Sequence, residues 1–99
     1  MTKPIRYSSH LTFRLKRRDI PQKLPTEVFE KAKEYFYDIK TNHYIAVTKI
    51  VSKGKEREMM VVFDVDEIIE LITIHPLKRG QKESRVKFGR WIGVREKEW

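Results

Sequence analysis

The sequence predicts an α+β fold in which two N-terminal helices pack on a three- to four-stranded antiparallel sheet. Three observations predict it: a three- and four-residue repeat of apolar residues in the first third, three β-branched apolar runs in the middle, and turn residues between those runs. The 99 residues are expected to form one domain, 1–99, and a domain of this size buries roughly 60–70% of its unfolded surface. The helices then have only this sheet to cover, which gives a layered structure.

A short helix is expected from His10, because the hydroxyl groups of Ser8 and Ser9 can accept the free amide protons of a first helical turn. Pro21 disfavours helical geometry at the residue before it, so this helix should end by Ile20.

A second helix is expected to start at Pro25 or Thr26, since proline suits a first helical position and Glu27 suits the positive end of the helix dipole. Apolar residues at helical spacing form one stripe of this helix: Val28, Phe29, Ala32, Tyr35, Phe36 and Ile39.

Three strands are expected over residues 43–51, 59–65 and 68–75, each apolar enough to be covered by other elements. Turn residues separate the first two, and Pro76 ends the third because it lacks an amide proton. The tail, residues 78–99, allows two interpretations. Residues 81–88 form a third helix closed by Gly89, or residues 85–94 form an outer strand.

Positive charge is concentrated at the two ends of the chain. Residues 1–23 carry seven basic and one acidic side chain, residues 24–77 seven and ten, and residues 78–99 eight and three. The net charges are therefore +6, −3 and +5. If the two ends meet in the fold, they form one basic surface that attracts polyanions such as RNA.

The composition also excludes several classes. No cysteine is present, so disulfides and thiolate metal sites are excluded. No apolar run is long enough for a membrane span or a signal peptide, which predicts a cytoplasmic protein without membrane partners. The Lys and Glu enrichment weakly favours a thermophilic source.

A cationic strip is expected on the first helix, where His10, Arg14 and Arg18 follow one another at four-residue spacing. Guanidinium groups on such a strip can bind phosphate. The alternative is an ordinary solvated helix face that is basic.

His75 is expected at the end of the third strand, and Lys78 and Arg79 follow it after Pro76 and Leu77. A metal-independent ribonuclease needs a base for the 2′-hydroxyl, an acid for the leaving oxygen and cations for the phosphate, and these residue types supply them. The alternative is a locally hydrogen-bonded histidine beside a solvated Lys-Arg pair.

Other candidates are weaker. His10, His43 and His75 lack the short spacing of a metal motif, so neither a metal nor a cofactor is expected. Lys49 shares a strand face with apolar residues and is either a site cation or an edge lysine. Trp91, beside Arg90, is the aromatic residue expected to stack on RNA bases.

The order of two helices, a strand meander and a basic tail resembles the RelE/ParE toxin superfamily. More specifically, the run from His10 through Arg14, Arg18 and Asp19 to Ile20 resembles the His-x3-Arg-x3-Arg-Gly-Ile signature of a small uncharacterised domain family near those toxins and near BrnT. In that family a strand ends in a His-Pro-like turn, and 74–76 (Ile-His-Pro) fills this place. Asp19 replaces the usual glycine. The resemblance covers residues 8–80.

The resemblance implies two helices on an antiparallel sheet, cleavage of messenger RNA on the ribosome, and an antitoxin protein, expected to be acidic, that covers the basic face. Position gives the catalytic candidates of a metal-independent endoribonuclease: His75, Arg79, Arg85 and Lys49. It also gives the RNA-binding candidates: His10, Arg14, Arg18, Lys78, Arg90 and Trp91. The hypothesis is thus an RNA-targeting toxin-like protein. The alternatives are a non-catalytic nucleic-acid-binding module and a protein-interaction domain.

Overall fold

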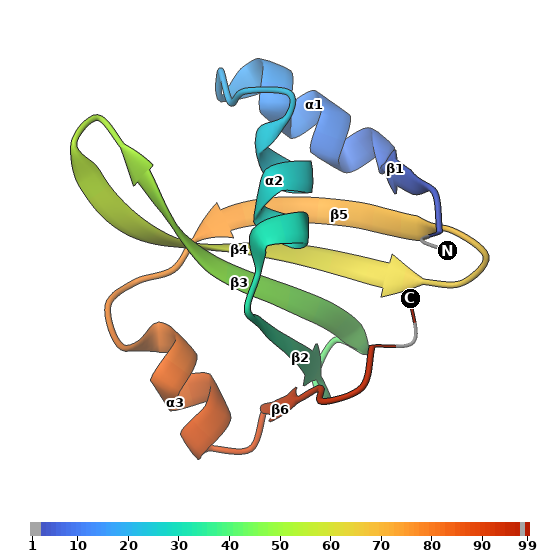
Figure 1. The fold of residues 1–99 in the computed structure, drawn as a ribbon, viewed down its shortest axis with the longest axis vertical. Helices are drawn as coiled ribbons and strands as arrows, with labels where there is room; N and C mark the ends of the chain where they lie inside the picture. The colour runs from blue at the N-terminus through green and yellow to red at the C-terminus, as the bar shows by residue number, and fades with distance from the viewer. Residues whose placement is uncertain (1–2, 98) are drawn as a thin grey trace.

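A computed structural model describes residues 3–97 and 99, and within this part of the chain three helices accompany one six-stranded sheet (Figure 1). The elements follow one another as β1 (Ile5–Tyr7), α1 (Ser9–Arg17), α2 (Leu24–Lys31), β2 (Glu34–Asp38), β3 (His43–Ser52), β4 (Lys55–Val65), β5 (Ile69–Pro76), α3 (Gln81–Lys87) and β6 (Trp91–Gly93). The strands lie in the order β1-β5-β4-β3-β2-β6. β1 pairs with β5 in parallel, and every other neighbouring pair is antiparallel.

The predicted α+β class is correct, but the predicted architecture of two helices on a three- to four-stranded antiparallel sheet is wrong. The described chain has a third helix and a mixed sheet of six strands. β1, which was missed, and β6, which was expected only as one alternative for the tail, have three residues each, which is too short to show an alternating pattern. Their partners in the sheet define them instead.

A further strand that was missed, β2, lies inside the stripe assigned to the second helix. α2 ends at Lys31, and Ala32 already has extended geometry (φ −59°, ψ 134°). Tyr35 and Phe36 are both buried because they point to opposite faces of the sheet, each of which is covered. Adjacent apolar residues of this kind fit one side of a helix and a two-sided strand equally well, and β-favouring aromatic residues decide for the strand.

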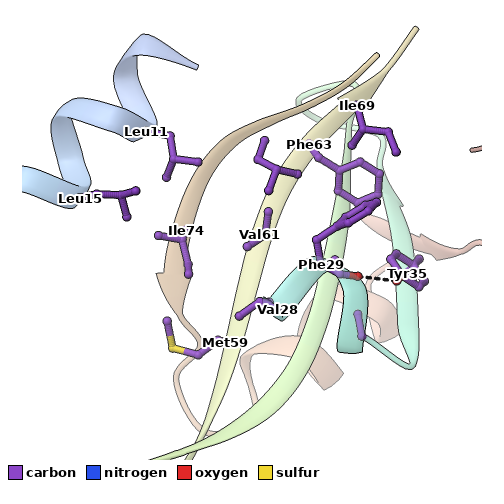
Figure 2. Packing of buried hydrophobic residues seen from close by; sticks show 13 residues of the cluster. Leu11, Leu15, Val28, Phe29, Tyr35, Met59, Val61, Phe63, Ile69 and Ile74 are labelled. Carbon is purple, nitrogen blue, oxygen red and sulfur yellow. Dashed lines mark hydrogen bonds between the residues drawn. The ribbon is translucent and has the colours of Figure 1, made fainter. Parts of the chain in front are cut away.

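The first helix begins as predicted. The hydroxyl of Ser8 accepts a hydrogen bond from the amide of Leu11 at 3.0 Å, and the amide of Ser8 donates to the carbonyl of Leu71 on β5 at 2.9 Å. α1 is thereby held along β5, and Leu11 and Leu15 point from it toward that strand, where Ile74 lies (Figure 2).

The main core lies between the sheet and helices α1 and α2. Figure 2 shows Val28 and Phe29 of α2 facing the buried side chains of β4, among them Phe63. Tyr35 is also in this core, and its hydroxyl donates a 2.6 Å hydrogen bond to the carbonyl of Phe29. We call this side of the sheet the helix face, and the opposite side the far face.

The far face is covered only in part. Its smaller core consists of five side chains from β2, β3, β6 and the residue after β5: Phe36, Ile45, Val47, Leu77 and Trp91. α3 lies at this side, held by Lys82, whose ammonium group lies 2.7 Å from Glu34 and 3.4 Å from Glu58. Both predicted interpretations of the tail are partly right, since a helix ends before Gly89 and a short strand follows it.

Two further features bear on the site. Beyond the residues that pair with β2 and β5, β3 and β4 continue as a two-stranded arm that projects from the sheet (Figure 1). The longest helix in the described residues has nine residues, so none there could cross a bilayer.

Candidate functional site

A cavity of about 300 Å³ lies on the far face where α3 and β6 leave the sheet uncovered. Its floor is apolar and comes from the middle of β3 and β4: Ile45, Met60 and Val62. Its polar walls come from β2, β3, β5, α3 and the loops beside β2 and β6: Asp38, Thr41, His43, Thr73, His75, Gln81, Arg85 and Arg90. The buried ring of Trp91 also lines it. We call it the far-face cavity. An apolar floor with a few polar groups around it is typical of small-ligand sites.

His75 forms one end of the far-face cavity and contacts the cationic strip predicted on the first helix. Arg14 Nη2 lies 3.0 Å from His75 Nδ1, and Arg14 Nε donates to the carbonyl of Ile74 at 3.1 Å. That carbonyl belongs to the edge of β5 beyond the residues paired with β1. The guanidinium therefore closes the open strand edge and fixes the imidazole at once.

This contact determines the tautomer of His75. A guanidinium can only donate, so Nδ1 must accept and the ring proton of the neutral imidazole sits on Nε2. Nε2 can donate weakly to the hydroxyl of Thr73, 3.4 Å away. Burial first, and then the positive charges of Arg14, His10 and Arg18, lower the pKa of His75 below its ordinary value of 6.5. His75 is therefore a neutral hydrogen-bond donor at physiological pH.

The C-terminal basic segment reaches the same cavity through Arg85 and Arg90, which line its walls. Arg90 is also structural: its Nε and Nη2 each donate at 3.0 Å to the carboxylate of Asp38, whose side chain is only 3% exposed. Burial alone would raise the pKa of Asp38. Hydrogen bonds from Arg90, the Lys40 amide and Thr41, with the charge of Arg90, outweigh burial and lower that pKa to about 2.

Trp91 is not presented for base stacking in this conformation. Its side chain is 3% exposed, and its ring packs against Phe36 with centroids 5.5 Å apart. The indole Nε1 is buried and has no hydrogen-bond partner among the described residues.

Three of the predicted site cations lie elsewhere. Lys49, Lys78 and Arg79 line a separate hollow beside the projecting arm, together with Glu56 and Glu58. The side chain of Lys49 is 64% exposed and its ammonium lies 3.8 Å from Glu56. The structure thus sets Arg14 in contact with His75 and brings the charges of His10 and Arg18 near it. Arg85 and Arg90 line the walls of the same cavity, whereas Lys49, Lys78 and Arg79 do not.

Sequence reasoning missed the second histidine of the cavity as a site residue. His43 Nδ1 lies 2.7 Å from Asp64 Oδ1, and the side chains are 36% and 45% exposed. His43 precedes Tyr44, which pairs with Phe63, so the register sets His43 beside Asp64 on the far face. The pair could have been predicted from the alternation of buried and exposed side chains along both strands, combined with the register in which the two strands pair.

Comparisons of the chain with models of protein families, with curated proteins and with solved structures gave no match.

Proposed function

We propose that this protein is an RNA-targeting, toxin-like protein that binds single-stranded RNA across the far-face cavity and cleaves it without a metal ion. One observation carries the proposal: the contact between Arg14 and His75 joins the basic first helix to a cavity whose other wall carries Arg85. The two basic segments of the sequence, residues 1–23 and 78–99, therefore border one hollow. The toxin character, the ribosome as the place of cleavage and an acidic antitoxin as partner come from the resemblance described above.

The chemistry of the cavity suits an unstacked nucleotide. The floor of Ile45, Met60 and Val62 is apolar and accepts the flat face of a base, whereas the walls supply donors for phosphate. In the tautomer that the Arg14 contact requires, His75 Nε2 holds a proton and has no lone pair for another. We therefore assign His75 a donor role toward a phosphate oxygen of the bound RNA, with Arg85 supplying positive charge.

The test is cleavage of an end-labelled messenger RNA by purified protein, with and without translating ribosomes. The wild type should give discrete cuts. His75→Ala should weaken RNA binding and make the cuts fainter, and His75→Gln should retain more of both because its amide places a donor near the position of Nε2. Arg57→Ala removes an exposed charge on the arm and serves as the control. Equal activity of His75→Ala and the wild type would contradict the assignment.

The second candidate is a non-catalytic RNA-binding module, and the tautomer of His75 favours it. A neutral imidazole whose Nδ1 is occupied by Arg14 offers no proton acceptor at this end of the cavity. This candidate predicts affinity that falls steeply as salt rises, without products in either condition. Binding and cleavage measured on the same RNA distinguish the two candidates.

A further inference from the structure

The His43 end of the far-face cavity carries the proton acceptor that the His75 end lacks. A carboxylate can only accept, so the 2.7 Å contact with Asp64 Oδ1 requires His43 Nδ1 to donate. In the neutral ring Nε2 then has a free lone pair. The pairing of a histidine with a carboxylate through Nδ1 is the arrangement that orients an imidazole for proton transfer at Nε2.

The position of this lone pair is open to a ligand. His43 lines the cavity and is 36% exposed, and its Nε2 makes no hydrogen bond to any other described residue. Asp38 pairs with His43 across β2 and β3, and Arg90, bound to Asp38, lines the same wall. A phosphate next to His43 would therefore have positive charge nearby, partly offset by Asp38.

The two histidines lie too far apart to act on one phosphate. His75 pairs with Met60 on β4, whereas His43 lies beside Asp64, four residues further along the same strand. Four residues of strand span about 13 Å. An RNA strand along the cavity would thus meet a donor at His75 and an acceptor at His43 from different nucleotides.

We propose that His43 is the general base of the cavity, that Asp64 is its positioning residue, and that the substrate is single-stranded RNA with a free 2′-hydroxyl. This rests on the proposed function. His43 Nε2 takes the proton of the 2′-hydroxyl, the 2′-oxygen bonds to the adjacent phosphorus, and the bond from phosphorus to the 5′-oxygen breaks. The leaving oxygen takes a proton from water, and the imidazolium returns one to the resulting hydroxide. The products are a 2′,3′-cyclic phosphate and a 5′-hydroxyl.

The experiment measures single-turnover cleavage of an RNA oligonucleotide and of the same oligonucleotide with 2′-deoxyribose throughout, under the condition in which messenger RNA is cut. The wild type should cut only the RNA and leave a cyclic phosphate. His43→Ala and His43→Gln should cut at least about 100-fold more slowly. Affinity for the uncleavable deoxy oligonucleotide should change less than threefold.

The role of Asp64 is tested by Asp64→Asn and Asp64→Glu, with Asp66→Asn in the adjacent turn as the matched control. Asp64→Asn should slow cleavage at least tenfold with unchanged affinity, Asp64→Glu should restore part of the rate, and Asp66→Asn should match the wild type. If Asp64→Glu cleaves as slowly as Asp64→Asn, the carboxylate does not position His43.

The outcomes separate this inference from the proposed function. Wild-type cleavage that persists within threefold in His43→Ala would overturn the role of His43 and leave the ribonuclease proposal standing. Cleavage of the deoxy oligonucleotide would overturn the 2′-hydroxyl mechanism in the same way. A wild type that binds RNA and never cuts it would overturn both the His43 mechanism and the proposed cleavage.

Discussion

The two ends of the far-face cavity carry the same side chain under opposite constraints. At one end Arg14 donates to Nδ1 of His75, so Nε2 carries the proton. At the other end Asp64 accepts from Nδ1 of His43, so Nε2 of the neutral ring has a free lone pair. One imidazole is a donor and the other an acceptor toward any ligand between them. The role of a histidine therefore depends on which hydrogen-bonding partner the fold sets beside it.

The largest expected effect concerns the wall that joins the two ends. Asp38→Ala leaves the guanidinium of Arg90 half-buried without its carboxylate, and should lower the free energy of unfolding by about 3 kcal/mol. Urea unfolding at pH 7 measures this, with Asp66→Ala at an exposed turn as the control. The stabilisation belongs to the ionised carboxylate, whose folded pKa is depressed, so it should be present above about pH 4 and disappear toward pH 2. If Asp38→Ala lowers the free energy of unfolding by less than 1 kcal/mol, the Asp38–Arg90 pair does not stabilise this wall as proposed.

A second variant breaks the His75 end alone. Arg14→Ala leaves His75 Nδ1 and the Ile74 carbonyl without their donor, and should cost about 2 kcal/mol of stability. It also removes a positive charge that lowers the pKa of His75, so that pKa should rise. An NMR titration of the ring protons measures the change. Arg17→Ala is the control. Arg17 lies about one turn further along the same helix and makes no such contact with the described residues, so this variant should leave the pKa of His75 near its wild-type value.

Breaking the His43 end should cost less. The His43–Asp64 pair is 36% and 45% exposed, and Asp64→Asn should lower the free energy of unfolding by only about 0.5 kcal/mol. The contrast with Arg14→Ala would be lost if both variants proved equally destabilising under the same urea conditions.

The smallest effect is the pH dependence due to His75. Its folded pKa lies below 6.5, so the unfolded chain binds more protons as the pH falls through that value. The stability that neutral His75 contributes is thus present above about pH 6.5 and decreases below it. The difference in free energy of unfolding between the wild type and His75→Gln, measured at pH 7.5 and at pH 5, isolates this contribution. A wild type that gains stability relative to His75→Gln at pH 5 would contradict the sign.

Local signals predicted much of this molecule. The hydroxyl cap at Ser8, the end of the third strand at Pro76 and the turn at Gly89 depend on the residues themselves, so the sequence shows them directly. The strands β1 and β6 depend on partners far along the chain, and β2 follows a helix whose apolar stripe it prolongs. The apolar spacing alone does not separate such cases.

The candidate site shows the same division. The basic strip of the first helix was predicted from four-residue spacing and His75 from its place at the end of a strand, and the structure sets Arg14 of that strip in contact with His75. The pairing of His43 with Asp64 depends on the register of two strands, and the burial of Trp91 depends on β6 joining β2. The sequence does not distinguish Lys49 and Arg79 from Arg85, because a basic residue alone does not indicate which hollow it lines. The structure places the first two beside the arm and Arg85 in the far-face cavity.

The most direct test of the account is the tautomeric state of the two rings. Long-range proton–nitrogen NMR spectra of ¹⁵N-histidine-labelled protein at pH 7.5 distinguish a protonated Nδ1 from a protonated Nε2 in each neutral imidazole. We expect the proton on Nδ1 in His43 and on Nε2 in His75, with His75 switching its pattern in Arg14→Ala and His43 switching in Asp64→Asn. The same tautomer in both rings of the wild type would contradict the division of the cavity into a donor end and an acceptor end.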